Sequence, residues 1–325
     1  MNLTVDVYKR NIFDLIGNLR TSGIGGQYTK TANYGKMEAH GLEVTLGGVP
    51  ITREKGFKWR TQVNFGLNKN KVTELEVNQN IWTLVRAEGA PLEGKSPRGL
   101  YSLQFAGLNP EYGFPTFIGA NGKPSPYVEL QSDDVEYLKY HGPVDPTFTG
   151  GYYNQFIYKN FTLSALITFA AGNYVRLQPT FADAYSDMDA LSRDITDRWI
   201  MPGDEKYTNI PSILDQLTST NFVINPNTGL AVNSRYPYNA YNYSTERVAK
   251  GDFIRLKNIS VGYQFPKAMI SKLGLNNLQL ALVGNNIALL YSDKKLNGAD
   301  PEFFNNGGVA MPIPKQYTLS LKVGF

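Results

Sequence analysis

The last nine residues of the chain alternate strictly between apolar and polar side chains, and this pattern restricts the fold more than any other feature. The apolar positions are Tyr317, Leu319, Leu321, Val323 and Phe325, and only polar or small residues lie between them. Successive side chains of a β-strand point to opposite faces, so a period of two gives this segment one wholly apolar face. We therefore predict a strand over 317–325 whose apolar face lies in an apolar environment.

The same period recurs upstream and predicts an all-β protein. Its clearest upstream example covers residues 57–68. Within 253–265 the apolar phase changes at Lys257 and Asn258, which predicts a β-bulge there. The remaining candidates bring the total to about ten strands. They cover residues 3–10, 41–47, 81–86, 98–105, 148–158, 161–171 and 278–287.

The predicted connections alternate between short and long. Short ones cover 48–56, 87–97, 159–160 and 266–277, and long ones cover 106–147, 172–252 and 288–315. Membrane barrels have short periplasmic turns and long extracellular loops, whereas a soluble sandwich has no reason to keep such a regular alternation. If Phe325 lies at the periplasm, every short connection becomes periplasmic. The sequence thus predicts a transmembrane antiparallel β-barrel in the outer membrane of a Gram-negative cell.

Composition excludes several other classes. No run of about 18 apolar residues occurs, so no transmembrane helix is expected. Cysteine is absent, which excludes disulfides and thiolate metal sites. The net charge of +4 comes from scattered residues, so nucleic-acid binding is not expected. Two helices are predicted inside connections, over 181–199 and over 266–273, the second of which begins at a proline and stops before Gly274.

Ten strands could close a small barrel, but a connection as long as 172–252 is large for the rim of such a barrel. The loops therefore indicate a larger barrel. If the ten strands formed an open sheet in lipid, the edge strands would leave unpaired backbone groups, each costing several kcal/mol. We expect further strands from an N-terminal remainder of the same polypeptide. The start of the chain also lacks the basic and apolar regions of a signal peptide. All 325 residues are therefore interpreted as the C-terminal part of one barrel domain.

Several short segments, taken in order, resemble the SusC/RagA TonB-linked outer-membrane transporters of Bacteroidota, and the resemblance covers almost the whole chain. The matching segments are 107–115 (GLNPEYGFP), 145–154 (DPTFTGGYYN), 158–161 (YKNF), 197–199 (DRW), 253–263 (FIRLKNISVGY), 284–287 (GNNI), 297–302 (NGADPE) and 312–318 (PIPKQYT), followed by the terminal Phe325.

This resemblance implies a barrel of about 22 strands with a plug in its lumen. It also implies import of oligosaccharides or peptides, with a SusD-like surface lipoprotein on the extracellular side and energy from the TonB–ExbB–ExbD complex. The signal peptide, TonB box and plug would lie before Met1. Outer-membrane lipid would surround the chain.

Four tyrosines form the candidate substrate-facing cluster: Tyr236, Tyr238, Tyr241 and Tyr243. Aromatic faces stack on sugar rings and peptide side chains, although barrel girdles and loop cores also use tyrosine heavily. The terminal residues Tyr317, Leu319, Leu321, Val323 and Phe325 form the candidate barrel-assembly signal. The resemblance implies that role, and an aromatic girdle is the alternative.

No enzymatic activity, cofactor or metal is expected. The two histidines, His40 and His141, lie far apart, and no nucleophile elbow or phosphate-binding loop accompanies them. Asp300 and Glu302 fit a turn beside Pro301 better than a ligand pair. Two alternatives stay open: a soluble all-β carbohydrate-binding module that uses the four tyrosines, and a small complete outer-membrane barrel.

Overall fold

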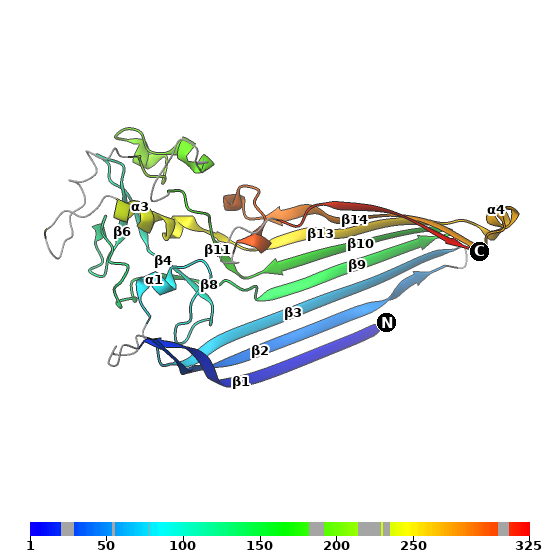
Figure 1. Cartoon of the computed structure of the whole chain (residues 1–325), viewed down its shortest axis with the longest axis horizontal. Helices are drawn as coiled ribbons and strands as arrows, with labels where there is room; N and C mark the ends of the chain where they lie inside the picture. Colours follow the sequence, from blue (N-terminus) through cyan, green and yellow to red (C-terminus); the bar gives the residue numbers. More distant parts are fainter. Residues whose placement is uncertain are drawn as a thin grey trace.

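The computed structural model describes residues 1–20, 29–53, 56–77, 79–181, 192–213, 229, 235–304 and 312–325. Long antiparallel strands lie side by side in one half of the molecule, and short elements fill the other half (Figure 1). Both labelled termini lie in the strand half, with the C-terminus at its far end near helix α4 (Figure 1).

The main sheet has eight strands, in the order β1-β2-β3-β9-β10-β13-β14-β15. These are β1 (Asn2–Arg20), β2 (Thr29–Thr52), β3 (Phe57–Leu75), β9 (Phe148–Tyr158), β10 (Phe161–Ala171), β13 (Phe253–Gln264), β14 (Asn277–Ser292) and β15 (Gln316–Gly324). Neighbours in sequence order are neighbours in space, and every pair is antiparallel. Among the described residues the sheet is open, with β1 and β15 at its edges. The up-and-down antiparallel arrangement agrees with the prediction.

Two of the predicted strands are not part of this sheet. Residues 81–86 were predicted as a strand, but they begin with helix α1 (Ile81–Leu84). The side chain of Asn80 accepts a hydrogen bond from the backbone N–H of Thr83 at 2.9 Å, an N-cap that starts the helix. Residues 98–105 contribute β4 (Gly99–Ser102), whose four residues are all buried and which pairs with β8 (Lys139–Pro143). Both segments belong to the loop half.

The predicted bulge is confirmed in β13. The register against β10 shifts between the pairs Leu166↔Asn258 and Ile167↔Leu256, which leaves Lys257 as the extra residue. The register against β14 shifts at the same place. Since one extra residue exchanges the two faces of a strand, the apolar positions change phase there.

The loop half has a hydrophobic core of its own. Its fully buried members include Ile81, Leu84, Leu103 and Phe117, each with 0% exposure. The elements that supply it and its surroundings are β5 (Phe105–Leu108), β6 (Pro115–Ile118), β7 (Pro124–Ser125), β11 (Tyr174–Arg176), β12 (Val248–Lys250), α3 (Arg235–Asn242) and the 3-10 helices η2 (Arg193–Asp197), η3 (Asp204–Lys206) and η4 (Thr245–Arg247). The long connections are therefore folded structures and not bare loops.

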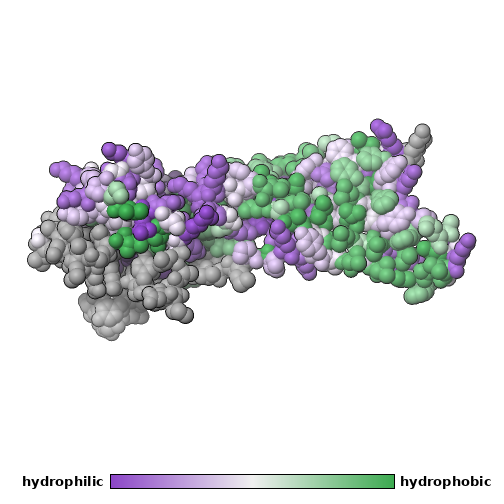
Figure 2. Space-filling model, turned by 90° about the horizontal axis from the view of Figure 1, so that it is seen from above, coloured by the Kyte–Doolittle hydropathy of each residue, from purple (hydrophilic) through white to green (hydrophobic). Residues whose placement is uncertain are grey.

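The sheet itself has the opposite distribution, because its apolar side chains are exposed. Leu319 is 70% exposed, Leu321 63%, Leu282 51% and Leu163 41%. The strand pairing places these residues on one face, in rows that cross the sheet. Figure 2 shows hydrophobic side chains gathered over the strand half, whereas the coloured part of the loop half is mostly hydrophilic, with one small hydrophobic group.

The two predicted helices have different outcomes. Residues 182–191 lie outside the described part, and the described remainder of 181–199 contains η2. The segment 266–273 forms α4 (Lys267–Ile270) and η5 (Ser271–Leu273), and Gly274 ends it with a φ of 71°. Pro266 is the N-cap of α4. None of the helices in the described ranges is long and apolar enough to cross a membrane.

The connections sort onto opposite ends of the sheet. The turns β2–β3, β9–β10 and β13–β14 are at one end, and the connections β3–β9, β10–β13 and β14–β15 are at the other. The last of these contains η6 (Lys294–Leu296) and η7 (Pro301–Phe303). Residues 87–97 were predicted as a short turn of their own, but they are part of the β3–β9 connection, because segment 81–86 is not a strand of the sheet.

Candidate functional site

The tyrosine cluster lies on and beside helix α3, within the loop half. Tyr241 is 2% exposed, and its ring packs against the rings of Phe105 and Phe181, each with centroids 5.8 Å away. Burial raises the pKa of the Tyr241 phenol. Tyr241 therefore contributes to the core of the loop half.

Tyr238 and Tyr243 are only partly buried. The Tyr238 ring lies 5.0 Å from that of Phe181, and its hydroxyl is 3.3 Å from the Ser212 hydroxyl. The Tyr243 ring meets Trp82 edge-on at 5.3 Å. The side chain of Tyr236 lies outside the described residues. The structure thus brings Tyr238, Tyr241 and Tyr243 together around α3, and their contact with a substrate stays a prediction.

Arg176, at the end of β11, is a buried cation beside Tyr243. It is 5% exposed and donates hydrogen bonds to the backbone carbonyls of Tyr101 and Ser244 and to the Ser102 hydroxyl. Its guanidinium lies 5.8 Å from the centre of the Tyr243 ring. Burial lowers the pKa of Arg176 to about 9, so the side chain keeps its charge at neutral pH. It ties three segments of the loop half together.

His141 on β8 is a second buried ionisable group. Its ring lies 5.8 Å from that of Tyr174, and its Nε2 is buried with no hydrogen-bond partner among the described residues. Burial, with a contribution from the Arg176 charge, lowers the pKa of His141 to about 4. This histidine is therefore neutral at physiological pH, and it lies apart from His40, which is on β2.

One ion pair lies within the β10–β13 connection, and a second set attaches the β14–β15 connection to the sheet. Arg247 Nη1 is 2.6 Å from Asp194 Oδ2. Arg255, near the start of β13 and next to the loop half, has 4% side-chain exposure. It contacts Asp300 at 2.5 Å and Glu302 at 2.9 Å. Asp300 also caps η7 by accepting a hydrogen bond from the Glu302 backbone N–H. The predicted turn at Asp300 and Glu302 is present, and its pairing with Arg255 was not predicted.

The face of the sheet opposite the exposed apolar rows is polar and hollowed. A groove of about 670 Å³ is lined by side chains that alternate with the apolar rows. Its polar members include Tyr8, Glu43, Thr45, Asn64, Thr149 and Thr168. Among these, Tyr8 covers Gly41 so closely that a Cβ there would lie 2.0 Å from the ring. A sheet with one apolar and one polar, grooved face suits a wall between lipid and water.

The last strand, β15, contains four of the five predicted residues in the alternating positions, and Phe325 directly follows it. Tyr317 and Leu321 pair with Gly284 and Leu280 of β14, and both belong to the exposed apolar rows. Phe325 is 89% exposed at the end of the strand. Its role in barrel assembly stays a prediction.

No group of three or more histidine, cysteine, aspartate or glutamate residues within the described ranges is arranged to hold a metal ion. The polar residues that the sequence did not reveal are Arg176 and Arg255. Arg255 lies in a predicted strand and Arg176 in the predicted connection 172–252, and each is paired with residues far away in sequence, which periodicity does not specify.

Comparisons with known proteins identify relatives in sequence. No protein-family model matches the chain. The chain is 25% identical over 317 residues to TonB-dependent receptor P3 of Formosa agariphila and 27% identical over 369 residues to TonB-dependent receptor P39 of the same organism. These alignments cover 93% and 96% of the chain, but only 29% and 32% of the relatives. The chain thus spans about a third of the length of the curated relatives that it matches.

Solved structures of similar fold agree with the sequence relatives. The structure of the RagAB peptide transporter has a TM-score of 0.72 at 20% identity, and that of the RagAB peptide importer in its closed-closed state has 0.71 at 21%. Both cover 99% of this chain and 33% of the other chain. At these identities the likeness shows a shared fold. The resemblance to TonB-dependent receptors of the SusC/RagA type is therefore confirmed, and it extends over nearly the whole chain.

Proposed function

We propose that this chain forms the C-terminal part of the barrel of an outer-membrane importer, which carries oligosaccharides or peptides across the membrane without changing them chemically. The relatives are receptors and transporters, which favours import over catalysis. The observation that carries the proposal is the division of the sheet into an exposed apolar face and a polar, grooved face.

The dimensions of the apolar face support a membrane location. On β3 its outer row runs from Phe57 to Leu67, interrupted by one polar residue, Thr61. Ten residue steps at about 3.3 Å each span about 33 Å along the strand. With the strand tilt of about 40° that membrane barrels have, the row is about 25 Å tall, equal to the apolar band of an outer-membrane barrel.

An aromatic girdle at the short-turn end supports the same orientation. Trp59 and Phe156 stack at 6.0 Å, and the Phe161 and Tyr263 rings lie 4.6 Å apart. Aromatic residues concentrate at the membrane–water interfaces of barrels. The short turns would then be periplasmic and the folded loop half extracellular.

The remaining barrel strands, plug and energy coupling are proposed to come from the rest of a longer polypeptide, since the chain spans about a third of its relatives. The proposed partners are a SusD-like surface lipoprotein over the loop half and the TonB–ExbB–ExbD complex in the inner membrane. Support comes from solved structures of the same fold, which are titled a peptide transporter and a peptide importer.

Substrate contact is proposed for the partly buried tyrosines of the cluster. Tyr238 and Tyr243 flank the buried Tyr241, so their rings are held by packing on one side. A ring fixed in this way stacks on a ligand at low entropic cost. Loss of such a contact weakens binding by about 0.5–1.5 kcal/mol per ring, or about two- to tenfold.

The test uses the full-length protein in its source bacterium. A deletion strain is complemented with the wild type, with the double variant Tyr238→Ala/Tyr243→Ala, or with Tyr207→Ala, whose ring is 89% exposed in the loop half. Uptake of labelled oligosaccharides and peptides is then measured, with and without TonB. We expect TonB-dependent uptake that falls in the double variant and not in the control.

Two outcomes would contradict the proposal. Uptake that does not depend on the protein would exclude an importer. Recovery of the full-length protein in the soluble fraction without detergent would favour the soluble carbohydrate-binding module.

A further inference from the structure

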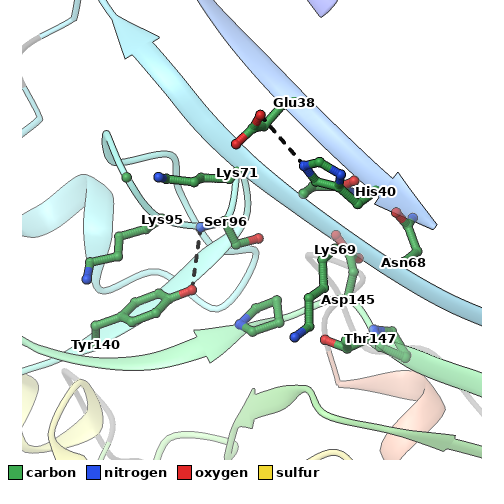
Figure 3. A pocket seen from close by; sticks show the side chains of 14 residues that line it. Glu38, His40, Asn68, Lys69, Lys71, Lys95, Ser96, Tyr140, Asp145 and Thr147 are labelled. Carbon is green, nitrogen blue, oxygen red and sulfur yellow. Dashed lines mark hydrogen bonds and ion pairs between the residues drawn. The ribbon is translucent and has the colours of Figure 1, made fainter. Parts of the chain in front are cut away.

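A basic pocket lies next to the exposed apolar face, at the end of the sheet where β2 and β3 meet the loop half. It has a volume of about 510 Å³. Its charged and aromatic lining residues are Glu38, His40, Lys69, Lys71, Lys95, Tyr140 and Asp145. Figure 3 shows these side chains around the space between β2, β3 and the segments before β9.

Strand register places part of this lining on the apolar face. Val7, Leu42 and Leu67 pair across β1, β2 and β3 and form the last apolar row. Two residues further along, the pairs Lys9↔His40 and His40↔Lys69 form a row of basic side chains. Because side chains two residues apart share a face, this basic row lies directly above the apolar row on the same side of the sheet. Lys71 follows one step higher, paired with Glu38.

The acidic residues of the pocket already have cations of their own. Glu38 Oε2 lies 3.8 Å from Lys9 Nζ and 3.6 Å from His40 Nε2. Asp145 Oδ1 lies 2.5 Å from Arg98 Nη1. Lys69, Lys71 and Lys95 make no ion pair with any residue of the described ranges. An excess of positive charge is therefore left in the pocket.

The loop side holds one of these lysines in place. Lys95 Nζ lies 5.2 Å from the centre of the Tyr140 ring, whose hydroxyl accepts a hydrogen bond from the Ser96 N–H. The Lys95 carbonyl accepts a hydrogen bond from Val72 N–H on β3 at 2.8 Å. In Figure 3 the ammonium groups of Lys71 and Lys95 extend to the same side of the pocket, and that of Lys69 points toward Thr147. Strand and loop thus both contribute lysines to the lining of one pocket.

We propose that this pocket binds a phosphate group of an outer-leaflet lipid headgroup. The inference rests on the proposed membrane orientation. Lys69 and Lys71 follow the end of the apolar row by about 7 and 13 Å along the strand, which corresponds to the polar headgroup region of a bilayer. An anionic nutrient on its way through the barrel would meet the opposite, polar face. The position of Lys69 and Lys71 on the apolar side of β3 therefore favours a lipid over a transported solute.

Lysine suits this ligand because its ammonium is a compact point charge that binds phosphate without fixed geometry. Each lysine near an anionic membrane surface contributes about 1 kcal/mol to attraction. Removal of all three should weaken retention of a phosphate-bearing lipid on the order of a hundredfold.

The test compares full-length wild type with Lys69→Gln/Lys71→Gln/Lys95→Gln. The matched control is Lys123→Gln/Lys206→Gln/Lys272→Gln, which removes the same charge from exposed lysines outside the pocket. Each protein is reconstituted into nanodiscs of phosphatidylcholine with increasing phosphatidylglycerol. Native mass spectrometry after partial delipidation then counts the phosphatidylglycerol molecules that stay bound. We expect the pocket variant to need about a hundredfold more of this lipid for equal occupancy, and the control to match wild type.

A second arm titrates inorganic phosphate in detergent against protein that carries bound phosphatidylglycerol. Displacement of bound phosphatidylglycerol only at phosphate concentrations far above those of the lipid supports the headgroup as ligand. Tight phosphate binding without preference for the lipid would overturn it. Equal lipid retention by wild type and pocket variant, in proteins that enter nanodiscs normally, would overturn the inference alone. Failure of all three proteins to enter a bilayer would instead contradict the proposed function.

Discussion

Arg255 is expected to hold the β14–β15 connection against the end of the sheet, and its replacement by glutamine should release that connection. The guanidinium contacts Asp300 at 2.5 Å, Glu302 at 2.9 Å and Asn286 Oδ1 at 2.6 Å. The exposed fraction of the side chain is 4% for Arg255 and 11% for Asp300. A glutamine at position 255 would leave the carboxylate of Asp300 buried without a cation.

The expected cost is large for a single side chain. Removal of one partner of a buried ion pair destabilises by about 3–5 kcal/mol. The lower figure applies here because the Glu302 side chain is 36% exposed and remains solvated. A change of about 3 kcal/mol in local opening raises the open population roughly a hundredfold. The exposed pair between Arg86 and Glu88 is the control, and Arg86→Gln should cost about 0–1 kcal/mol.

Limited proteolysis of outer-membrane vesicles measures this opening. Cleavage within residues 293–315 is followed by mass spectrometry under conditions where reclosing is faster than cleavage, so the rate reports the open population. Arg255→Gln should be cleaved about a hundredfold faster than wild type. The double variant Arg255→Gln/Asp300→Asn should recover part of the protection, because it removes the unpaired charge. Equal rates for Arg255→Gln and Arg86→Gln would refute the reasoning.

Three further predictions concern the loop half and the last strand. In the folded protein the pKa of His141 is lowered from 6.5 to about 4. As the pH falls below 6.5, the His141 imidazole is therefore protonated in the unfolded loop half before it is protonated in the folded one. The contribution of His141 to folding stability is complete above pH 6.5 and declines toward pH 4. After allowance for partial exposure the loss is about 2 kcal/mol, and His141→Gln should abolish it in hydrogen exchange of β8. Gly113→Ala should shift the fluorescence of Trp199 to longer wavelength, since a Cβ there would lie 2.3 Å from the indole, whereas Gly122→Ala, at a similar φ with open space around it, should not. Deletion of Phe325 should impair outer-membrane assembly of the full-length protein, measured as the amount of folded, heat-modifiable barrel. The variant Phe325→Trp, which keeps an aromatic residue at this position, should assemble like wild type.

The strands of the main sheet could be predicted from sequence because their two faces differ in polarity. One face is apolar and the other polar, so a period of two is imposed along the whole strand. The predicted bounds 148–158 and 161–171 coincide with β9 and β10. The bulge was visible for the same reason, since an extra residue breaks the period at Lys257.

The loop half could not be predicted in this way, because its segments are buried on both sides. Residues 99–102 are all buried, so no alternation marks their environment. Ile81, Leu84 and Val85 follow helical spacing, but the run is too short for the period to be decisive. The Asn80 cap was the available signal.

The candidate site was predicted only in part. The tyrosines around α3 could be found by composition, but the burial of Tyr241 depends on contacts with Phe105 and Phe181 that lie far away in sequence. The pairing of Arg255 with Asp300 joins residues 45 positions apart. Such contacts depend on how a connection folds back on the sheet, which periodicity does not specify.

The bulge at Lys257 divides strand β13 into two segments whose side chains alternate in opposite phase. Between the bulge and the short-turn end, Ile259 and Val261 belong to the exposed apolar rows, and on the other side of the bulge Ile254 does. Arg255 therefore lies on the polar face of the sheet, where it pairs with Asp300 and Glu302. Deletion of Lys257 would shift the segment 253–256 by one position and place a guanidinium on the apolar face. One backbone residue thus determines whether this strand carries a loop anchor or a misplaced charge.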